Sequence, residues 1–324
     1  MANPATSAVP ARASKAPEAG ALVATRRKRR YSLLTRPDKV LILLMVGIPL
    51  TFDILIIWGP ALASILLSFT DWAGIGQVTS QNIVGVKNYK TLFTGYAFFW
   101  PALEHNLIWL AFLAFIATPL GILLAVLLDR ELSGKRIYQS VFFLPVVLPL
   151  VVVGFIWELQ YAPSDGFLNN AFGLVKSGKI IDWLGNPSIN IYAALIATSW
   201  RHIGYIMVLY LAGLKSVDPS LREAAKVDGA TEVQTFFNVV LPVMAPINVI
   251  IVVVTAIEAL RAFDLAFIFN HGTNGLELLS ILITNNSISE ASLIGFGSAI
   301  AVVLLVISLG PIVLFLSRTM RAQA

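Results

Sequence analysis

The chain has 324 residues, of which 57% are hydrophobic and only 13% are charged. A soluble domain carries about 25% charged residues, and a mean hydropathy of +0.80 leaves too little polar surface to cover a water-exposed fold of this size. The composition therefore excludes a soluble globular protein and indicates a membrane protein. The 23 Lys and Arg residues give a net charge of +5, but they lie in short clusters between apolar runs, which argues against nucleic-acid binding. The absence of cysteine excludes disulfides, thiolate metal sites and cysteine nucleophiles.

The first segment, residues 1–38, is rich in Ala, Pro and Ser and carries a basic cluster at residues 26–30. It has no apolar run, so we expect a disordered tail. The apolar stretch that follows is far longer than the core of a signal peptide and lacks a small-residue cleavage site at its end. We therefore expect this stretch to remain in the protein as a membrane anchor.

Six apolar runs are long enough to cross a bilayer core of about 30 Å. They cover residues 40–69, 105–128, 140–160, 189–214, 245–269 and 292–316. The predicted fold is all-α, with six transmembrane helices in one domain at residues 39–318 and a short tail at residues 319–324. Prolines inside these runs interrupt helical hydrogen bonding, so we expect bent helices that can surround a cavity. These prolines are Pro49, Pro119, Pro145 and Pro149.

The distribution of Lys and Arg predicts the orientation. Residues 1–39, 129–139, 215–241 and 317–324 together hold 17 Lys and Arg, whereas the alternate loops hold only 4. By the positive-inside rule, both termini and the loop at residues 215–242 face the cytoplasm. The segments near residues 70–104, 161–188 and 270–291 then face outside.

The cytoplasmic loop between the fourth and fifth spans has a readable local structure. Asp218 or Ser220 can cap a short helix that Pro219 helps to begin, and Gly229 can supply the turn that ends it. A second helix, residues 231–240, would carry an apolar stripe. The stripe consists of Val233, Phe236, Phe237 and Val240. It either packs on the protein's own helix ends or is presented to a partner.

The same loop resembles the signature of the permease subunits of binding-protein-dependent ABC importers. That signature is Glu-Ala-Ala, three residues, Gly, nine residues and Ile-x-Leu-Pro; here Glu223-Ala224-Ala225, Gly229 and Leu241-Pro242 match, with Val239 at the Ile position. Further matches, over residues 40–318, resemble the carbohydrate branch and its maltose-permease-like half. They are Ser68-Phe69, Gly85-Val86-Lys87-Asn88-Tyr89, Asn106, Leu144-Pro145, Trp157, Gly166-Phe167-Leu168-Asn169 and Arg261-Ala262-Phe263-Asp264-Leu265.

The resemblance implies a type I ABC importer permease fold in a bacterial or archaeal cytoplasmic membrane. It implies a non-catalytic subunit that forms half of a pathway for a sugar, oligosaccharide or polyol-type solute. The implied partners are a second homologous permease, two ATPase subunits, an extracytoplasmic solute-binding protein and membrane lipid. This chain would bind no cofactor, because ATP and Mg²⁺ belong to the ATPase.

The resemblance also implies that the cytoplasmic loop docks into a cleft of the ATPase and couples nucleotide-driven closure to movement of the membrane helices. The implied coupling residues are Glu223, Ala224, Ala225, Asp228, Gly229, Phe236, Leu241 and Pro242. For Glu223 alone, an ion pair within its own helix is the alternative, because Lys226 follows three residues later.

Ionisable residues inside predicted spans are costly unless they face protein or a watery cavity. They are Asp53, Glu158, Arg201, Glu258, Arg261 and Asp264. Glu258, Arg261 and Asp264 recur every three residues and should stripe one face of the fifth span. The stripe either lines the pathway or holds spans together by pairing its own charges. The candidate pathway residues are Glu258, Arg261, Phe263, Asp264, Asn285 and Asn286, where Phe263 either offers a platform to a sugar face or serves packing.

Other functions find less support in the sequence. An ion-gradient-driven secondary transporter stays open, because Asp53 or Glu258 could serve as its mid-membrane acid. The three histidines, His105, His202 and His271, have no carboxylate or second histidine at metal-ligand spacing, so each is interpreted as packed or interfacial. Residues 173–180 match Gly-x4-Gly-Lys but lack the Ser or Thr that follows in an ATP-binding loop. We therefore expect the ATPase to be a separate subunit.

Overall fold

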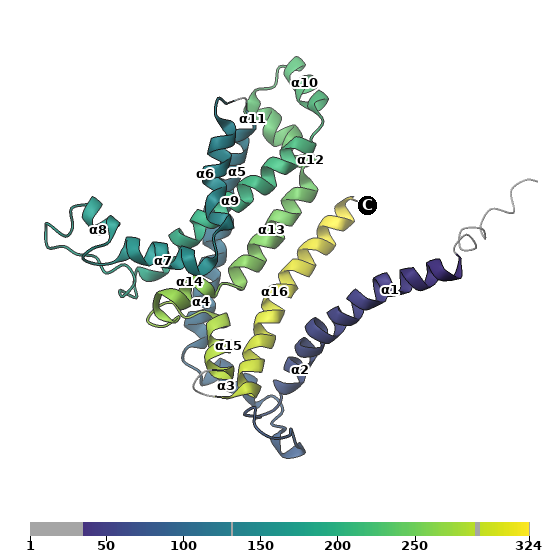
Figure 1. Cartoon of the computed structure of the whole chain (residues 1–324), viewed down its shortest axis with the longest axis vertical. Helices are drawn as coiled ribbons and strands as arrows, with labels where there is room; N and C mark the ends of the chain where they lie inside the picture. The colour runs from purple at the N-terminus through teal and green to yellow at the C-terminus, as the bar shows by residue number, and fades with distance from the viewer. Residues whose placement is uncertain (1–34, 131, 289–291, 324) are drawn as a thin grey trace, which may run out of the picture. The chain divides into compact units, whose positions relative to one another are not determined.

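The computed structural model describes residues 35–130, 132–288 and 292–323, and their regular structure is helical (Figure 1). By its contacts the described part of the chain divides after Pro60 into two compact units. The longer helices are α1 (Arg36–Asp53), α2 (Gly59–Leu67), α4 (Phe99–Phe112), α5 (Thr118–Asp129), α6 (Lys135–Val147), α7 (Leu150–Tyr161), α9 (Asn190–Ser216), α13 (Ala245–Leu260) and α16 (Ile294–Gln323). The shorter ones are α3 (Lys87–Thr94), α8 (Phe167–Ala171), α10 (Pro219–Val227), α11 (Glu232–Thr235), α12 (Leu241–Val243), α14 (Asp264–Asn270) and α15 (Leu279–Ser287).

The ends of the chain differ from the sequence prediction where they are described. The predicted tail lies outside the described residues as far as residue 34. Helix α1 begins at Arg36 because Thr35 caps it: the Asp38 N–H donates to Thr35 Oγ1, and the Thr35 N–H donates to Asp38 Oδ2. At the other end α16 continues to Gln323, so the segment predicted as a C-terminal tail is helical at residues 319–323.

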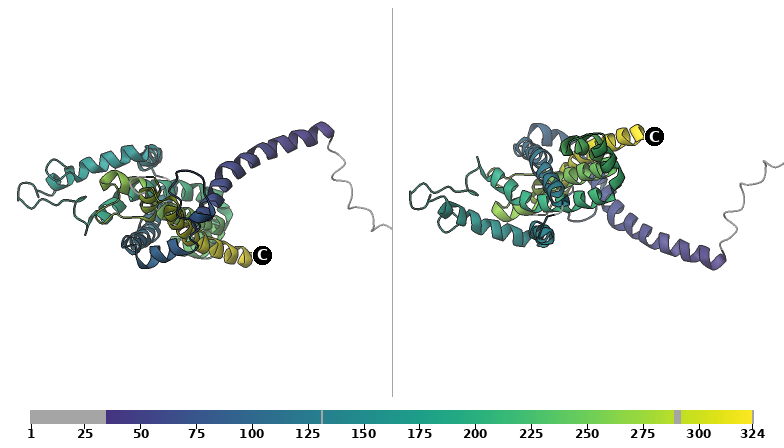
Figure 2. Two further views of the ribbon diagram at one scale, coloured as in Figure 1. Left: turned by 90° about the horizontal axis from the view of Figure 1, so that it is seen from below. Right: turned by 90° about the horizontal axis from the view of Figure 1, so that it is seen from above.

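Three single helical stretches are long and apolar enough to cross a membrane: Pro37–Leu67, Phe99–Asp129 and Ile294–Val313. Two bent pairs raise the number to five, with a bend of 101° between α6 and α7 and of 79° between Glu232–Val243 and Ala245–Asn270. The remaining predicted span, the fourth at residues 189–214, corresponds to α9, whose 27 residues reach about 40 Å. It is more polar than the others because it contains Arg201 and His202. The third predicted span, residues 140–160, is not straight, because it contains the bend between α6 and α7. Figure 2 shows α7 and α8 extending sideways from the other helices of the second unit.

Prolines determine where helices widen or break. Each of the three π-helical segments in the described residues ends two positions before a proline: Ile54–Trp58 before Pro60, Leu113–Ala117 before Pro119, and Phe236–Val240 before Pro242. Proline lacks the N–H that an α-helix needs and its ring clashes with the carbonyl one turn earlier, and a wider turn relieves both problems. The expected bend at Pro149 is confirmed, because this residue caps α7 at the break after α6. Pro145 lies inside α6 without a break.

Helix α9 packs along α5 and α6 and also contacts α13. Two glycines allow this close packing. A Cβ at Gly121 on α5 would lie 2.8 Å from Ile206 Cβ on α9, and a Cβ at Gly204 on α9 would lie 2.1 Å from the Phe142 carbonyl oxygen on α6. The core beside these contacts includes Met207 and Tyr210, both fully buried. Helix α9 therefore lies in close backbone contact with its neighbours.

Replacing Gly204 by alanine tests this packing. The added methyl must push α9 away from α6, and overpacking of this kind costs about 1–3 kcal/mol. We expect a clearly lower unfolding temperature in detergent. Gly310→Ala in α16 is the matched control, because among the described residues no atom beyond the adjoining helix backbone lies within 4 Å of its Cβ position, and it should leave the temperature unchanged or raise it slightly. Equal effects of the two substitutions would contradict the close α6–α9 contact.

Candidate coupling and pathway sites

The predicted cytoplasmic loop forms two short helices around a glycine turn. The Asp218 side chain caps α10 by accepting from the Ser220 N–H at 2.9 Å, and this bond holds the pKa of Asp218 below its ordinary value. Gly229 follows α10 with a φ of +80°, a backbone conformation that favours glycine. Thr231 then caps α11 in a capping box with Gln234. The predicted turn at Gly229 and the cap at Asp218 are thus confirmed.

The apolar stripe of the second helix divides between two surfaces. Phe236 and Val240 pack into the core around Tyr210, and Val240 is only 3% exposed. Val233 and Phe237 are 65% and 58% exposed. The two uses that the sequence left open are therefore both present: half of the stripe packs on the protein's own helices and half remains outside.

The predicted coupling residues lie mostly on the surface of this loop. Exposed members are Glu223, Ala224, Asp228, Gly229 and Pro242, whereas Leu241 and Phe236 are half-buried and Ala225 is buried. Among the ion pairs of the described residues, none joins Glu223 to Lys226. The Glu223 carboxylate is therefore exposed and not engaged by its helical neighbour.

A buried polar network joins three membrane helices. Glu258 Oε2 on α13 lies 2.7 Å from His202 Nδ1 on α9, and Glu258 Oε1 lies 3.3 Å from Arg201 Nη1. His202 is fully buried, and its Nε2 lies 2.9 Å from Thr118 Oγ1 on α5. Thr118 Oγ1 lies 3.1 Å from Thr255 Oγ1 on α13. The interpretation of His202 as a packed histidine is confirmed, and its carboxylate partner, Glu258, lies 56 residues away in the sequence.

The predicted stripe on the fifth span is interrupted. Helix α13 ends at Leu260, a turn follows, and α14 begins at Asp264, so Glu258, Arg261 and Asp264 do not share one face of a continuous helix. Arg261 and Asp264 are exposed, whereas Glu258 is partly buried. Within the described residues Glu258 forms its ion pairs with α9 and none with Arg261. A carboxylate–guanidinium network that holds two spans together is therefore present at Glu258, but its guanidinium is Arg201 of α9 and not a member of the stripe.

Three predicted pathway residues line one small cavity. Glu258, Phe263 and Asp264 meet there, and the volume of about 60 Å³ has room for a few waters or the edge of a sugar ring. The other lining residues are Trp109, Leu150, Thr198, Arg201, Ala262 and Leu265. Two buried donors on this lining, Trp109 Nε1 and Arg201 Nε, have no hydrogen-bond partner among the described residues.

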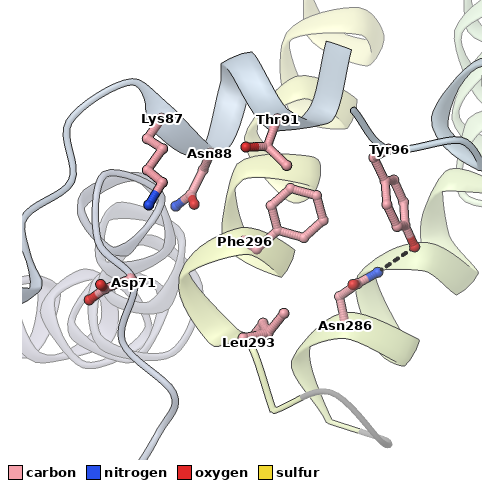
Figure 3. Close-up of a pocket in the computed structure, with 8 residues that line it drawn as sticks. All are labelled: Asp71, Lys87, Asn88, Thr91, Tyr96, Asn286, Leu293 and Phe296. Atoms are coloured by element: carbon pink, nitrogen blue, oxygen red, sulfur yellow. Dashed lines mark hydrogen bonds between the residues drawn. The ribbon is translucent and has the colours of Figure 1, made fainter. Parts of the chain in front are cut away.

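The remaining predicted pathway residues lie elsewhere. Arg261 is exposed beside the cavity lining, at the turn after α13. Asn286 on α15 donates to Tyr96 Oη at 2.9 Å and borders a second cavity of about 310 Å³, with Asn285 next to it in sequence. Figure 3 shows this cavity between α3 and the α15–α16 region, lined also by Asp71, Lys87, Asn88, Thr91, Leu293 and Phe296. Its amide groups are engaged within the protein, since Asn88 donates to the carbonyls of Ser68 and Thr70.

Sequence reasoning missed Trp109 and Thr198 as lining residues. Trp109 lies in an apolar run and was indistinguishable from a packing residue. A weak signal existed, because an indole N–H inside lipid must find a partner. Thr198 precedes Arg201 by three residues, one helical turn, so a polar face of the fourth span could have been recognised from the sequence.

The chain is similar to known transport proteins. The family described as "Binding-protein-dependent transport system inner membrane component" matches residues 117–322. A xylose/arabinose import permease of Haloferax volcanii is 32% identical over 269 residues, covering 82% of this chain and 84% of that protein. A permease for the uptake of osmoprotective compounds in Synechocystis is 31% identical over 273 residues, covering 82% and 93%.

Solved structures confirm the fold. A chain in the crystal structure of a bacterial ABC transporter involved in alginate import has a TM-score of 0.74 and 20% identity, covering 88% of this chain and 96% of that one. This likeness supports the predicted importer permease fold. The family match sets aside the ion-gradient alternative, because the family works with a binding protein. The chain belongs to the family of binding-protein-dependent transport system inner membrane components, and it is the multi-pass, non-catalytic permease subunit of an ABC importer.

Proposed function

We propose that this permease carries a polyhydroxylated solute, namely a sugar, oligosaccharide or polyol, past the cavity at Glu258, Phe263 and Asp264. The observation that carries the proposal is the lining itself, where the carboxylates of Glu258 and Asp264 come together with the Arg201 side chain and the Phe263 ring. Hydroxyl groups both donate to carboxylates and accept from N–H donors. The relatives named for xylose/arabinose and osmoprotective compounds support the same class of cargo.

The cavity is too small for a whole sugar ring, so the pathway would be completed by a second, homologous permease. In this proposal Glu258 and Asp264 accept from solute hydroxyls and Phe263 faces an apolar sugar edge. Arg261 borders the outer side of the cavity, and Asn285 and Asn286 border the route nearer the outside.

Asp264→Asn tests the pathway. An exposed carboxylate on the cavity lining that accepts from a solute hydroxyl contributes about 1.5–3 kcal/mol, so its loss should lower kcat/KM for import about 10- to 100-fold. The measurement is solute uptake by the reconstituted transporter with its binding protein, over a panel of sugars and polyols. Asp165→Asn is the control, because Asp165 is exposed in the loop after α7 and outside the cavity. Unchanged kinetics in Asp264→Asn, and likewise in Arg261→Gln, would remove the pathway proposal.

We further propose that the loop at residues 215–242 docks into a cleft on a separate ATPase, which alone binds ATP and Mg²⁺. Two exposed features support this docking: the polar face that carries Glu223, Asp228 and Gly229, and the outward side chains of Val233 and Phe237. Exposed apolar side chains beside a rigid glycine turn are suited to an interface. Nucleotide-driven movement of the ATPase would then shift the permease between inward-facing and outward-facing states.

Gly229→Asp tests this docking. It places a side chain at an exposed turn with a φ of +80° and no atom within 4 Å of the new Cβ, so the protein should assemble but lose most import. Gly76→Asp is the matched control, since Gly76 has a φ of +75° and equally open surroundings in a loop predicted to face outside. Equal loss of import in both variants would show that backbone strain, and not loss of docking, causes the defect.

The orientation of the termini is also a proposal, supported by the excess of Lys and Arg in the tails and the loop at residues 215–242. The chain contains no cysteine, so a single introduced cysteine can be labelled selectively. A membrane-impermeant maleimide should react with Ser177→Cys in intact spheroplasts and with Val227→Cys only after the membrane is opened. Both side chains are exposed. Labelling in the reverse order would invert the topology.

A further inference from the structure

Two consecutive residues at the end of α5 contact both helices of the loop at residues 215–242, which is called the coupling loop below. Asp129 Oδ2 lies 2.7 Å from Arg222 Nη1 on α10, and Asp129 Oδ1 lies 2.8 Å from Lys215 Nζ at the end of α9. Its neighbour Arg130 forms an ion pair with Glu232 in the first turn of α11. The loop is therefore held from the side by a helix that is far away in the sequence.

The contact at Asp129 is the stronger of the two. The Asp129 side chain is only 11% exposed, and Arg222 also donates to the Leu214 carbonyl at 3.3 Å, which ties α10 to the last turns of α9. A charge-assisted pair that is largely shielded from water depends strongly on both partners. Arg130 and Glu232 are 57% and 72% exposed, and an exposed pair contributes little by itself.

We propose that Asp129 is a positioning residue of the coupling step, with Arg130 as an auxiliary contact. Through them α5 moves together with α10 and α11, so movement of the docked loop reaches the interior of the membrane domain along α5 as well as through the covalent connections to α9 and α13. The inference rests on the proposed docking of the loop to the ATPase. It predicts that breaking the Asp129 contact leaves docking intact and impairs the transmission of movement.

The direction of the Asp129 side chain determines which functions a variant at this position should keep and which it should lose. Asp129 lies at the end of α5 and its carboxylate is turned to Lys215 and Arg222, not to the outer surface of the loop where Glu223 is exposed. A variant at Asp129 therefore retains the docking surface. Its ATPase should still assemble and hydrolyse ATP, but with fewer solute molecules imported for each ATP.

Asp129→Asn in the assembled, reconstituted transporter tests the proposal. We expect co-purification of the ATPase, at least a tenfold lower import rate and at least a fivefold higher ratio of ATP hydrolysed to solute imported. Asp129→Glu keeps the carboxylate and should restore most import. Charge reversal at Arg130→Glu should give a smaller defect that Glu232→Arg repairs, and Arg136→Gln, which removes an exposed cation from the same cytoplasmic side, should have no effect.

A distance measurement separates transmission from simple destabilisation. Spin labels at Leu127→Cys on α5 and Val227→Cys on α10, both exposed positions in a chain without native cysteine, should keep the same separation with and without ATP. In Asp129→Asn that separation should change or broaden on ATP binding. A wild-type separation that shifts with ATP, or normal coupling in Asp129→Asn, would overturn the proposal.

The failure of this inference can be told apart from failure of the docking proposal. If the loop docks but α5 does not transmit its movement, Gly229→Asp loses import and Asp129→Asn does not. If the loop does not dock at all, neither variant changes the ratio of ATP hydrolysed to solute imported.

Discussion

The pairing of Glu258 with His202 and Arg201 allows α9, which carries these two basic side chains in its middle, to lie among the other membrane helices. An unpaired charge in a membrane helix is expensive, and α9 carries two potential cations in its middle. The carboxylate from α13 pairs with both side chains, while Thr118 Oγ1 on α5 lies within hydrogen-bond distance of the other imidazole nitrogen. The network therefore fixes which faces of α5, α9 and α13 meet, and it places the cavity next to a cluster of polar groups.

Prolines provide the second constraint on the shape of the domain. A straight helix cannot accept proline without losing a hydrogen bond and creating a clash. In the described residues a π-helical turn precedes Pro60, Pro119 and Pro242, and the helix breaks at Pro149. Each of these changes keeps most backbone N–H and C=O groups hydrogen-bonded, as a lipid environment requires. The bend between α12 and α13 also follows from this constraint, since Pro246 lies in the first turn of α13, and it allows the loop at residues 215–242 to leave the direction of the membrane helix.

The sequence was sufficient for features that depend on local chemistry or on composition. The apolar runs predicted the helices, Gly229 and Asp218 predicted the turn and cap of the loop, and the Glu-Ala-Ala signature indicated the family. Features that depend on contacts between distant residues could not be predicted in this way. The partner of His202 lies 56 residues away, and the contact from Asp129 to Arg222 spans 93 residues. The turn at Arg261 could not be predicted either, because a pattern repeated every three residues does not show where a helix ends.

Helix α5 connects the two polar regions of the domain. Thr118 at its first residue contacts His202 and Thr255 in the network beside the cavity, and Asp129 at its last residue contacts the coupling loop. Eleven residues of helix separate them, a distance of about 16 Å, and Gly121 between them brings α5 into backbone contact with α9. A closely packed helix pair is difficult to compress or shear gradually. If the loop moves as proposed, a displacement applied at Asp129 would reach Thr118 as movement of a rigid body, and the polar network beside the cavity would rearrange or move with it.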